Sequence, residues 1–178
     1  MGLNTIREAL PGYARDTKLN LGTVIANSAL PEQQGWGTAL ACAVAARNPT
    51  VLRAIAEEAV GRLKPEAIEA AKGAASVMAM NNVYYRAKHL IGDQAYATLP
   101  ARLRMQLIGN PGVDTIDFEL WCLAVSAIGG CGSCLESHER TLRTAGVSRE
   151  VIHDALRIAS VVNAAAVTLA AEEGLRSG

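Results

Sequence analysis

Apolar residues recur along most of this chain at the three-to-four-residue spacing of helices that bury one face. Alternating apolar and polar runs bounded by tight turns, which would indicate strands, are nearly absent. The pattern therefore predicts an all-α fold of about eight to ten helices with no sheet.

Proline, glycine and asparagine divide this pattern into segments, because these residues tend to begin or end helices. A short helix or turn is expected between Gly92 and Pro100, and residues 109–112 form the clearest loop. Asn81 and Asn82 are predicted to break one long apolar run into two helices. The predicted helices cover residues 5–10, 15–28, 32–46, 51–63, 66–80, 83–90, 101–108, 115–128, 130–144 and 149–173.

Length and composition are those of one helical domain spanning 1–178, with a core rich in alanine and only 4% aromatic residues. Lys plus Arg and Asp plus Glu both number 17, so no basic surplus indicates nucleic-acid binding. The first eight residues lack the apolar core of a signal peptide. The longest apolar runs, interrupted by Asn163 and by Arg47, fall short of a membrane span. We expect a cytoplasmic protein with no membrane partner.

A weak internal repeat suggests a duplicated helical unit. Residues 75–86 resemble residues 124–134, with an apolar helix, a pair of small or amide residues and a new helix in each. Val83 aligns with Cys131, and Arg86 aligns with Cys134. We therefore predict two degenerate repeats, roughly 20–100 and 101–178, of which only the second carries thiols.

Two cysteines and a histidine follow a glycine pair as Cys131-x-x-Cys134-x-x-x-His138. A helix beginning near Gly130 would place both thiols in its first turn and all three side chains on one stripe about 60° wide. The helix dipole and the free backbone N–H groups there favour thiolates. The imidazole, one turn further along, could accept a thiol proton.

This motif has three interpretations. Zinc would need two further ligands; His138 could be one, but Cys42, Cys122, His89 and His153 lack the paired spacing that the other would need. Alternatively, the cysteines are two small residues at a helix start with no chemical role. The third and favoured interpretation is a redox-active dithiol/disulfide couple that needs neither metal nor bound cofactor. Without strands, the fold cannot be that of thioredoxin.

Glu119 lies in a strongly apolar setting, Phe118-Glu119-Leu120-Trp121. One interpretation is an acid near the start of a helix, where the dipole favours it. The other is a buried carboxylate that needs a partner, for which His138 is a candidate. Sequence spacing alone does not bring the two together.

Other candidates receive structural interpretations. Cys42 and Cys122 lie in segments rich in alanine and leucine and are predicted to be core residues. Tyr84, Tyr85 and Arg86 could line a pocket, but packing and surface roles are the expectation.

Residues 118–121 followed by Cys131-x-x-Cys134-x-x-x-His138 resemble the E…CxxCxxxH signature of the alkyl hydroperoxidase D (AhpD) family, within the carboxymuconolactone decarboxylase-like group. Further segments resemble this family in the same order, so the likeness covers nearly the whole chain: 19–21, 36–38, 47–49, 78–86, 103–105, 110–112 and 138–143.

The resemblance implies an all-α fold with a duplicated unit, assembled as a homotrimer. It implies an antioxidant, thiol-dependent alkyl hydroperoxide reductase. In this family pattern Cys134 attacks the peroxide and becomes a sulfenic acid, and Cys131 resolves it as a disulfide. Glu119 and His138 relay the proton.

The resemblance also implies partners. Dihydrolipoamide on a lipoyl-bearing acyltransferase, with lipoamide dehydrogenase upstream, would reduce the disulfide. Cys131 would exchange with a peroxiredoxin of the AhpC type.

One departure from the family pattern concerns Ser133, because many members carry a histidine directly before the peroxidatic cysteine. A hydroxyl cannot hold a proton as an imidazolium does near neutral pH, so the relay would be shorter and turnover slower. The alternative function is therefore an electron carrier for a peroxiredoxin with little peroxidase activity of its own. A decarboxylase or isomerase of the wider group would not need the thiol pair.

Overall fold

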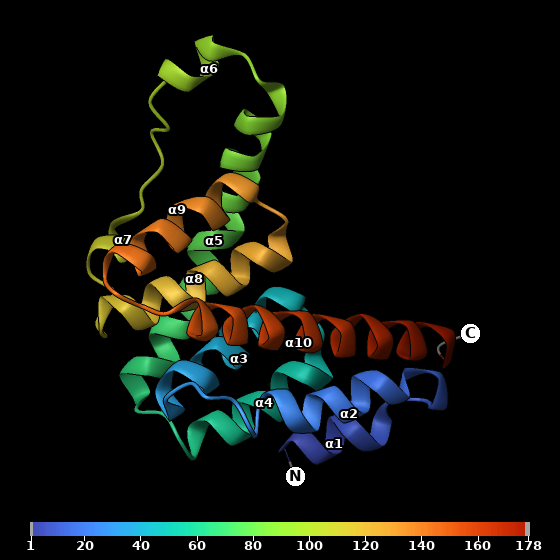
Figure 1. Cartoon of the computed structure of the whole chain (residues 1–178). Coiled ribbons are helices and arrows are strands. Elements are labelled where there is room, and N and C mark those ends of the chain that lie inside the picture. The colour runs from blue at the N-terminus through green and yellow to red at the C-terminus, as the bar shows by residue number, and fades with distance from the viewer. Residues whose placement is uncertain (1, 177–178) are drawn as a thin grey trace.

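A computed structural model describes residues 2–176 and confirms the all-α fold, since no strand occurs within that range (Figure 1). Most helices lie close to the predicted ranges and differ at their ends by a few residues. Their order is α1 (Gly2–Ala9), η1 (Gly12–Ala14), α2 (Arg15–Val24), α3 (Glu32–Ala46), α4 (Pro49–Val60), α5 (Pro65–Ile91), α6 (Gln94–Thr98), α7 (Gln106–Gly109), α8 (Thr115–Gly129), α9 (Gly132–Thr144) and α10 (Arg149–Arg176).

Helix α8 is the centre of the packing. Its residues from Asp117 to Ser126 are all buried, because α3, α5, α9 and α10 cover it from different sides. Gly37 of α3 allows a close approach to α8, since a Cβ atom there would overlap the indole ring of Trp121. The Trp121 Nε1–H donates to the Gln34 carbonyl oxygen at 3.2 Å and fixes the crossing of the two helices.

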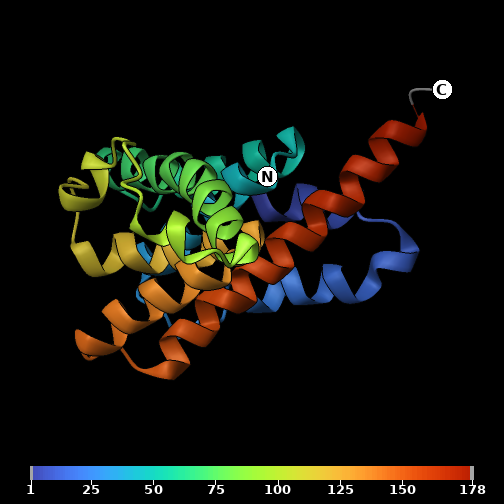
Figure 2. The same cartoon turned by 90° about the horizontal axis from the view of Figure 1, so that it is seen from above.

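Helix α10 crosses the body of the molecule, and its C-terminal turns extend beyond the other helices (Figure 2). By length and composition alone, α10 is long and apolar enough to span a membrane. The prediction that the longest apolar runs fall short of a membrane span was therefore wrong for this helix. Its apolar stripe packs on α2, α3, α4 and α8 and so contributes to the helical core.

Two predicted helix boundaries were wrong. Asn81 and Asn82 do not interrupt a helix, because α5 runs without a break from Pro65 to Ile91. The predicted helix over 101–108 is reduced to the single turn α7, and residues 101–105 are not helical. The first repeat therefore has no helix junction where the second has one.

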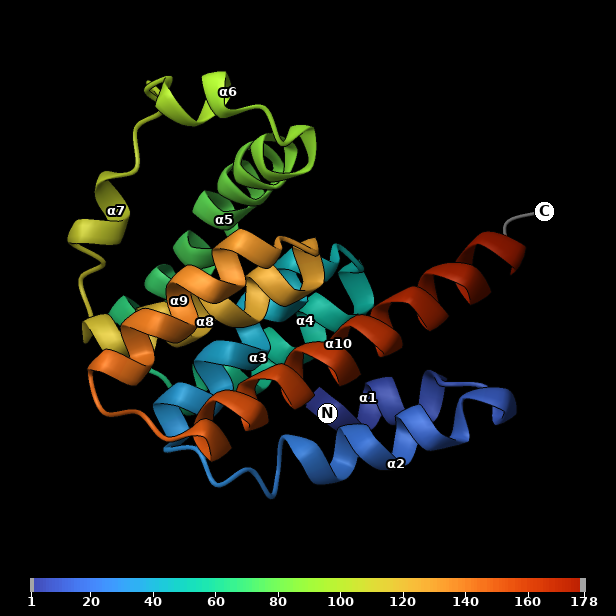
Figure 3. The same ribbon diagram turned by 45° about the horizontal axis from the view of Figure 1, so that its top comes forward.

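The C-terminal part of α5, together with α6, forms an arm that stands away from the body (Figure 3). The chain returns from the arm through residues 99–105 to α7 at the rim of the body. Every residue from 91 to 100 is exposed. Leu90, Ile91 and Leu99 are therefore large apolar side chains with no cover in the single chain.

Candidate active site

The junction between α8 and α9 positions both thiols. Gly130 ends α8 in the left-handed conformation, at φ 65°, which glycine adopts without strain. The Gly130 N–H donates to the Ala127 carbonyl and the Cys131 N–H donates to the Ser126 carbonyl, both at 3.2 Å. These two bonds form a Schellman motif, which satisfies the last carbonyls of α8 and turns the chain sharply.

Helix α5 holds this junction from the side. The Asn82 amide donates to the Val125 carbonyl at 3.4 Å and accepts from the Ser126 hydroxyl at 3.0 Å. One turn later, the Arg86 guanidinium donates to the Gly129 carbonyl at 2.5 Å. Arg86, interpreted from sequence as a packing or surface residue, therefore helps to place the start of α9.

Cys131 is the N-cap of α9, so the helix begins one residue after it and not near Gly130 as predicted. Its sulfur accepts the Cys134 N–H at 3.3 Å, and its carbonyl accepts the Leu135 N–H at 3.0 Å. Cys131 and Cys134 form a disulfide, with their Cα atoms 5.3 Å apart. Of the two cysteines in this disulfide, Cys131 is fully buried and Cys134 is 6% exposed.

His138 lies one turn after Cys134 on α9 and is buried with Glu119 of α8. Its Nδ1 is 2.6 Å from Glu119 Oε2, which is a short hydrogen-bond distance. The structure thus brings together the two residues that sequence spacing could not connect. The other ring nitrogen, Nε2, lies 3.3 Å from the Met78 sulfur of α5.

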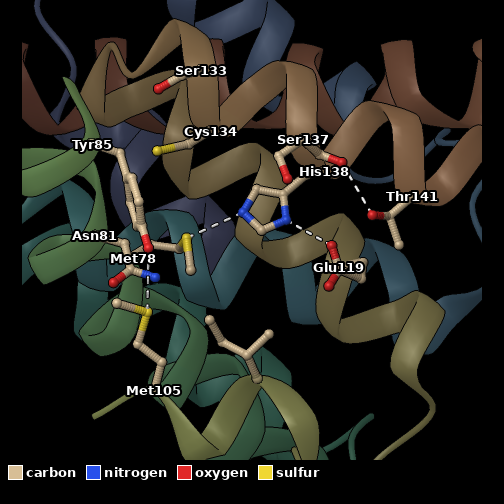
Figure 4. A pocket seen from close by; sticks show the side chains of 11 residues that line it. Met78, Asn81, Tyr85, Met105, Glu119, Ser133, Cys134, Ser137, His138 and Thr141 are labelled. Atoms are coloured by element: carbon tan, nitrogen blue, oxygen red, sulfur yellow. Dashed lines mark hydrogen bonds and ion pairs between the residues drawn. The ribbon is translucent and has the colours of Figure 1, made fainter. Parts of the chain in front are cut away.

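A cavity of about 350 Å³ opens over these groups (Figure 4). One wall is a stripe of α9 and the other a stripe of α5, each made of residues three or four apart. The α9 wall carries Cys134 and His138, and the Cys134 sulfur points into the cavity from above. The cavity is lined by Met78, Asn81, Tyr85, Met105, Ile108, Glu119, Ser133, Cys134, Ser137, His138 and Thr141.

Several lining residues were not predicted from sequence. Tyr85 was interpreted as packing, and Met78, Asn81, Met105 and Ile108 were not candidates at all. A helical stripe of Met78, Asn81 and Tyr85 was visible in the sequence, but the expected break at Asn81 hid it.

Ser133 also lines the cavity, and its hydroxyl lies 3.6 Å from the Cys131 sulfur. It does not stand between Cys134 and His138. Within residues 2–176, no three His, Cys, Asp or Glu side chains gather as metal ligands would.

The other two cysteines are buried core residues, as predicted. Burial raises the pKa of the Cys42 thiol far above its usual range. Burial raises the pKa of Cys122 in the same way, and the nearby Glu119 carboxylate adds to that shift. Both groups therefore stay protonated near neutral pH, in contrast to a reactive thiol.

Comparison with known proteins places these residues in a family context. The carboxymuconolactone decarboxylase family matches residues 94–175. The chain is 62% identical over 172 residues to alkyl hydroperoxide reductase AhpD of Streptomyces coelicolor, and 60% identical over 172 residues to that of Streptomyces griseus. It is 55% identical over 175 residues to the protein of the same name from Hyphomonas neptunium. The first two alignments cover 97% of each chain, and the third covers 98% of this chain and 97% of its relative.

Proposed function

Since the chain belongs to the AhpD family, we propose that it is a thiol-dependent alkyl hydroperoxide reductase that cycles Cys131 and Cys134 between dithiol and disulfide. One observation carries this proposal. Cys134, half of a disulfide, shares a cavity with a histidine that is buried against a carboxylate at 2.6 Å. A thiol nucleophile, a base and a group that orients the base are the parts that nucleophilic catalysis requires.

The first step is the attack of reduced Cys134 on the hydroperoxide. His138 Nε2 accepts the thiol proton, and Glu119 stabilises the imidazolium through Nδ1. The thiolate attacks the terminal peroxide oxygen, so a sulfur–oxygen bond forms and the oxygen–oxygen bond breaks. Cys134 becomes a sulfenic acid, and the alkoxide leaves as an alcohol after taking the proton back from His138.

Cys131 completes the oxidative half of the cycle. The Cys131 thiol loses its proton, and the thiolate attacks the Cys134 sulfenic sulfur; the sulfur–oxygen bond breaks as the disulfide forms, and the departing hydroxide takes up that proton and leaves as water. Its N-cap position favours that thiolate, since the Cys134 N–H already points at the sulfur. The short Cα separation allows the bond to form with little backbone movement.

Dihydrolipoamide is the proposed reductant, acting without a bound cofactor. It is carried on a lipoyl-bearing acyltransferase, and lipoamide dehydrogenase supplies its electrons. Its first thiolate attacks one sulfur of the disulfide and forms a mixed disulfide with the protein. Its second thiol then attacks that mixed disulfide, which frees the reduced protein and closes oxidised lipoamide. Cys131 is proposed to pass electrons to an AhpC-type peroxiredoxin in the same way. We place this chemistry in the cytoplasm, in a homotrimer.

The test is stopped-flow mixing of the fully reduced protein with tert-butyl hydroperoxide, with free thiols counted before and after. Wild-type protein should lose two thiols per chain, and dihydrolipoamide should restore them. Cys134→Ser should abolish peroxide consumption, whereas Cys42→Ser should leave it unchanged. Peroxide consumption by Cys134→Ser at the wild-type rate would refute the assignment.

A second candidate, an electron carrier for a peroxiredoxin, is favoured by Ser133. Its hydroxyl lies beside Cys131 and brings no second imidazole to Cys134. Slow oxidation by peroxide, together with fast reduction of an oxidised peroxiredoxin by the reduced protein, would establish this alternative.

A further inference from the structure

Two adjacent asparagines of α5 are equally buried but differently used. Asn81 and Asn82 are each 4% exposed. The Asn82 amide is engaged at both ends by the end of α8. Asn81 Oδ1, by contrast, has no hydrogen-bond partner. An unpaired buried amide oxygen costs about 1–3 kcal/mol, so Asn81, unlike Asn82, does not stabilise the fold through its side-chain oxygen.

Asn81 points into the cavity from the wall opposite Cys134 (Figure 4). It lies one turn after Met78, whose sulfur meets His138 Nε2, and one turn before Tyr85. Because Asn81 Oδ1 is shielded, Nδ2 is the polar atom of this amide that is left to meet a molecule in the cavity. The side chain thus adds a neutral N–H donor to an otherwise largely apolar wall.

We propose that Asn81 binds the hydroperoxide and donates a hydrogen bond through Nδ2 to its alkoxy oxygen. This inference rests on the proposed function. When the Cys134 thiolate attacks the terminal oxygen, negative charge develops on the alkoxy oxygen as the oxygen–oxygen bond breaks. A donor fixed near that oxygen stabilises the transition state more than the ground state, and His138 then delivers the proton that makes the alcohol.

The apolar rim formed by Met105 and Ile108 complements this role. A bound molecule would place its peroxide group between Cys134 and Asn81 and its alkyl group against these two side chains. Hydroperoxides that carry an alkyl group therefore suit the cavity better than hydrogen peroxide, which has nothing to place there.

The experiment compares reduced wild type with Asn81→Ala and with Asn81→Leu, which keeps the side-chain shape but lacks the donor. The rate constant for oxidation by tert-butyl hydroperoxide should fall on the order of 100-fold in both variants. The rate of Cys134 alkylation by iodoacetamide should stay within about twofold, because iodide leaves without a hydrogen bond. Peracetic acid, whose acetate leaves readily, should show a smaller loss than tert-butyl hydroperoxide.

Asn163→Ala is the matched control, because it makes the same change at a half-buried position of α10 that does not line the cavity. This variant should be oxidised by tert-butyl hydroperoxide at the wild-type rate. Unchanged peroxide oxidation in both Asn81 variants would overturn the inference, and so would an equal loss of alkylation, which would indicate a disturbed thiol. No reaction of the wild type with peroxide would instead refute the proposed function and this inference with it.

Discussion

Cys131 shows how a single residue can serve structure and chemistry together. Its N–H closes the Schellman motif of α8, its sulfur caps α9, and the same sulfur forms the disulfide. Sequence spacing predicted a thiol pair near a helix start with a histidine one turn on. The capping role was missed, because it depends on the αL turn at Gly130, which only the folded backbone reveals.

Removing the base should slow chemistry without unfolding the protein. We expect His138→Gln to lower the rate constant for peroxide oxidation on the order of 100-fold or more, since general-base assistance is lost. Stopped-flow measurement of the reduced variant checks this. Glu136→Gln, which removes a charge from the exposed face of the same helix, should react like wild type. Equal losses in both variants would argue against a role for His138 as base.

Thiol titration should distinguish the four cysteines. In the reduced native protein Cys134 should react with a chromogenic disulfide, and Cys131 should then attack the mixed disulfide and close the Cys131–Cys134 bond, which releases two equivalents of chromophore per chain. Because burial raises the pKa of Cys42 and Cys122, raising the pH from 7 to 9 should not add to this number. Denaturant should expose all four thiols. Three or four reactive thiols in the native state would contradict the burial of these two residues.

At the scale of elements, the helical pattern predicted where most helices lie, and its failures have physical causes. Asparagine is a poor helix former, so a break at Asn81 and Asn82 was reasonable. Tertiary bonds from Asn82 to α8 stabilise the unbroken helix instead. Residues 101–105 must return from the arm to the body, and an extended segment of five residues reaches about 17 Å where a helix of the same length covers about 8 Å.

The crossing of α3 and α8 depends on a missing side chain. A Cβ atom at Gly37 would overlap the Trp121 ring, so Gly37→Ala should destabilise the fold by about 1–3 kcal/mol through overpacking. Urea unfolding measures this difference. Gly174→Ala on α10 has open space around it and should be neutral or slightly stabilising. If Gly37→Ala were as stable as wild type, this crossing could not be as close as described.

Asp154 of α10 ties the segment between α2 and α3 to the body. Its carboxylate accepts the Ala29 N–H at 3.1 Å and the Arg157 guanidinium at 2.8 Å. Burial alone would raise the Asp154 pKa, but the hydrogen bonds from Ala29 and Arg157 outweigh it and lower the pKa. Because the Asp154 pKa is lower in the folded protein than in the unfolded chain, the ionised carboxylate stabilises the fold at pH values above the unfolded-state pKa. This stabilisation is lost as the pH falls through the folded-state pKa.

We therefore expect Asp154→Asn to cost about 1 kcal/mol of stability at pH 7, and the difference to shrink as the pH falls through the lowered pKa of Asp154. Denaturant unfolding at several pH values measures both quantities. A loss that stayed the same down to acidic pH would show that the charge of Asp154 contributes nothing.

At the scale of the molecule, the arm is the part whose large apolar side chains stay exposed in the single chain. Leu90, Ile91 and Leu99 are more than half exposed on it, and a soluble monomer rarely displays such side chains together. The proposed homotrimer would cover them. The two-repeat organisation stays a prediction, because the continuous α5 shows no junction matching that of α8 and α9.

Charges placed on the arm should therefore disrupt assembly. We expect wild-type protein to sediment as a trimer and Leu90→Glu combined with Leu99→Glu to sediment as a smaller species. Val167→Glu, an apolar-to-acid change at an exposed position of α10 outside the arm, should leave assembly unchanged. A trimer that survives the double change would place the subunit contacts elsewhere.

The burial of the disulfide determines which reductants can reach it. Cys131 is wholly buried, and Cys134, which is 6% exposed, lines the cavity of about 350 Å³ beside His138. A dithiol that can enter this cavity should therefore exchange with the disulfide faster than a thiol that cannot. Under the proposed function, the oxidation state of the pair would then respond more to the supply of such a dithiol than to the general thiol pool.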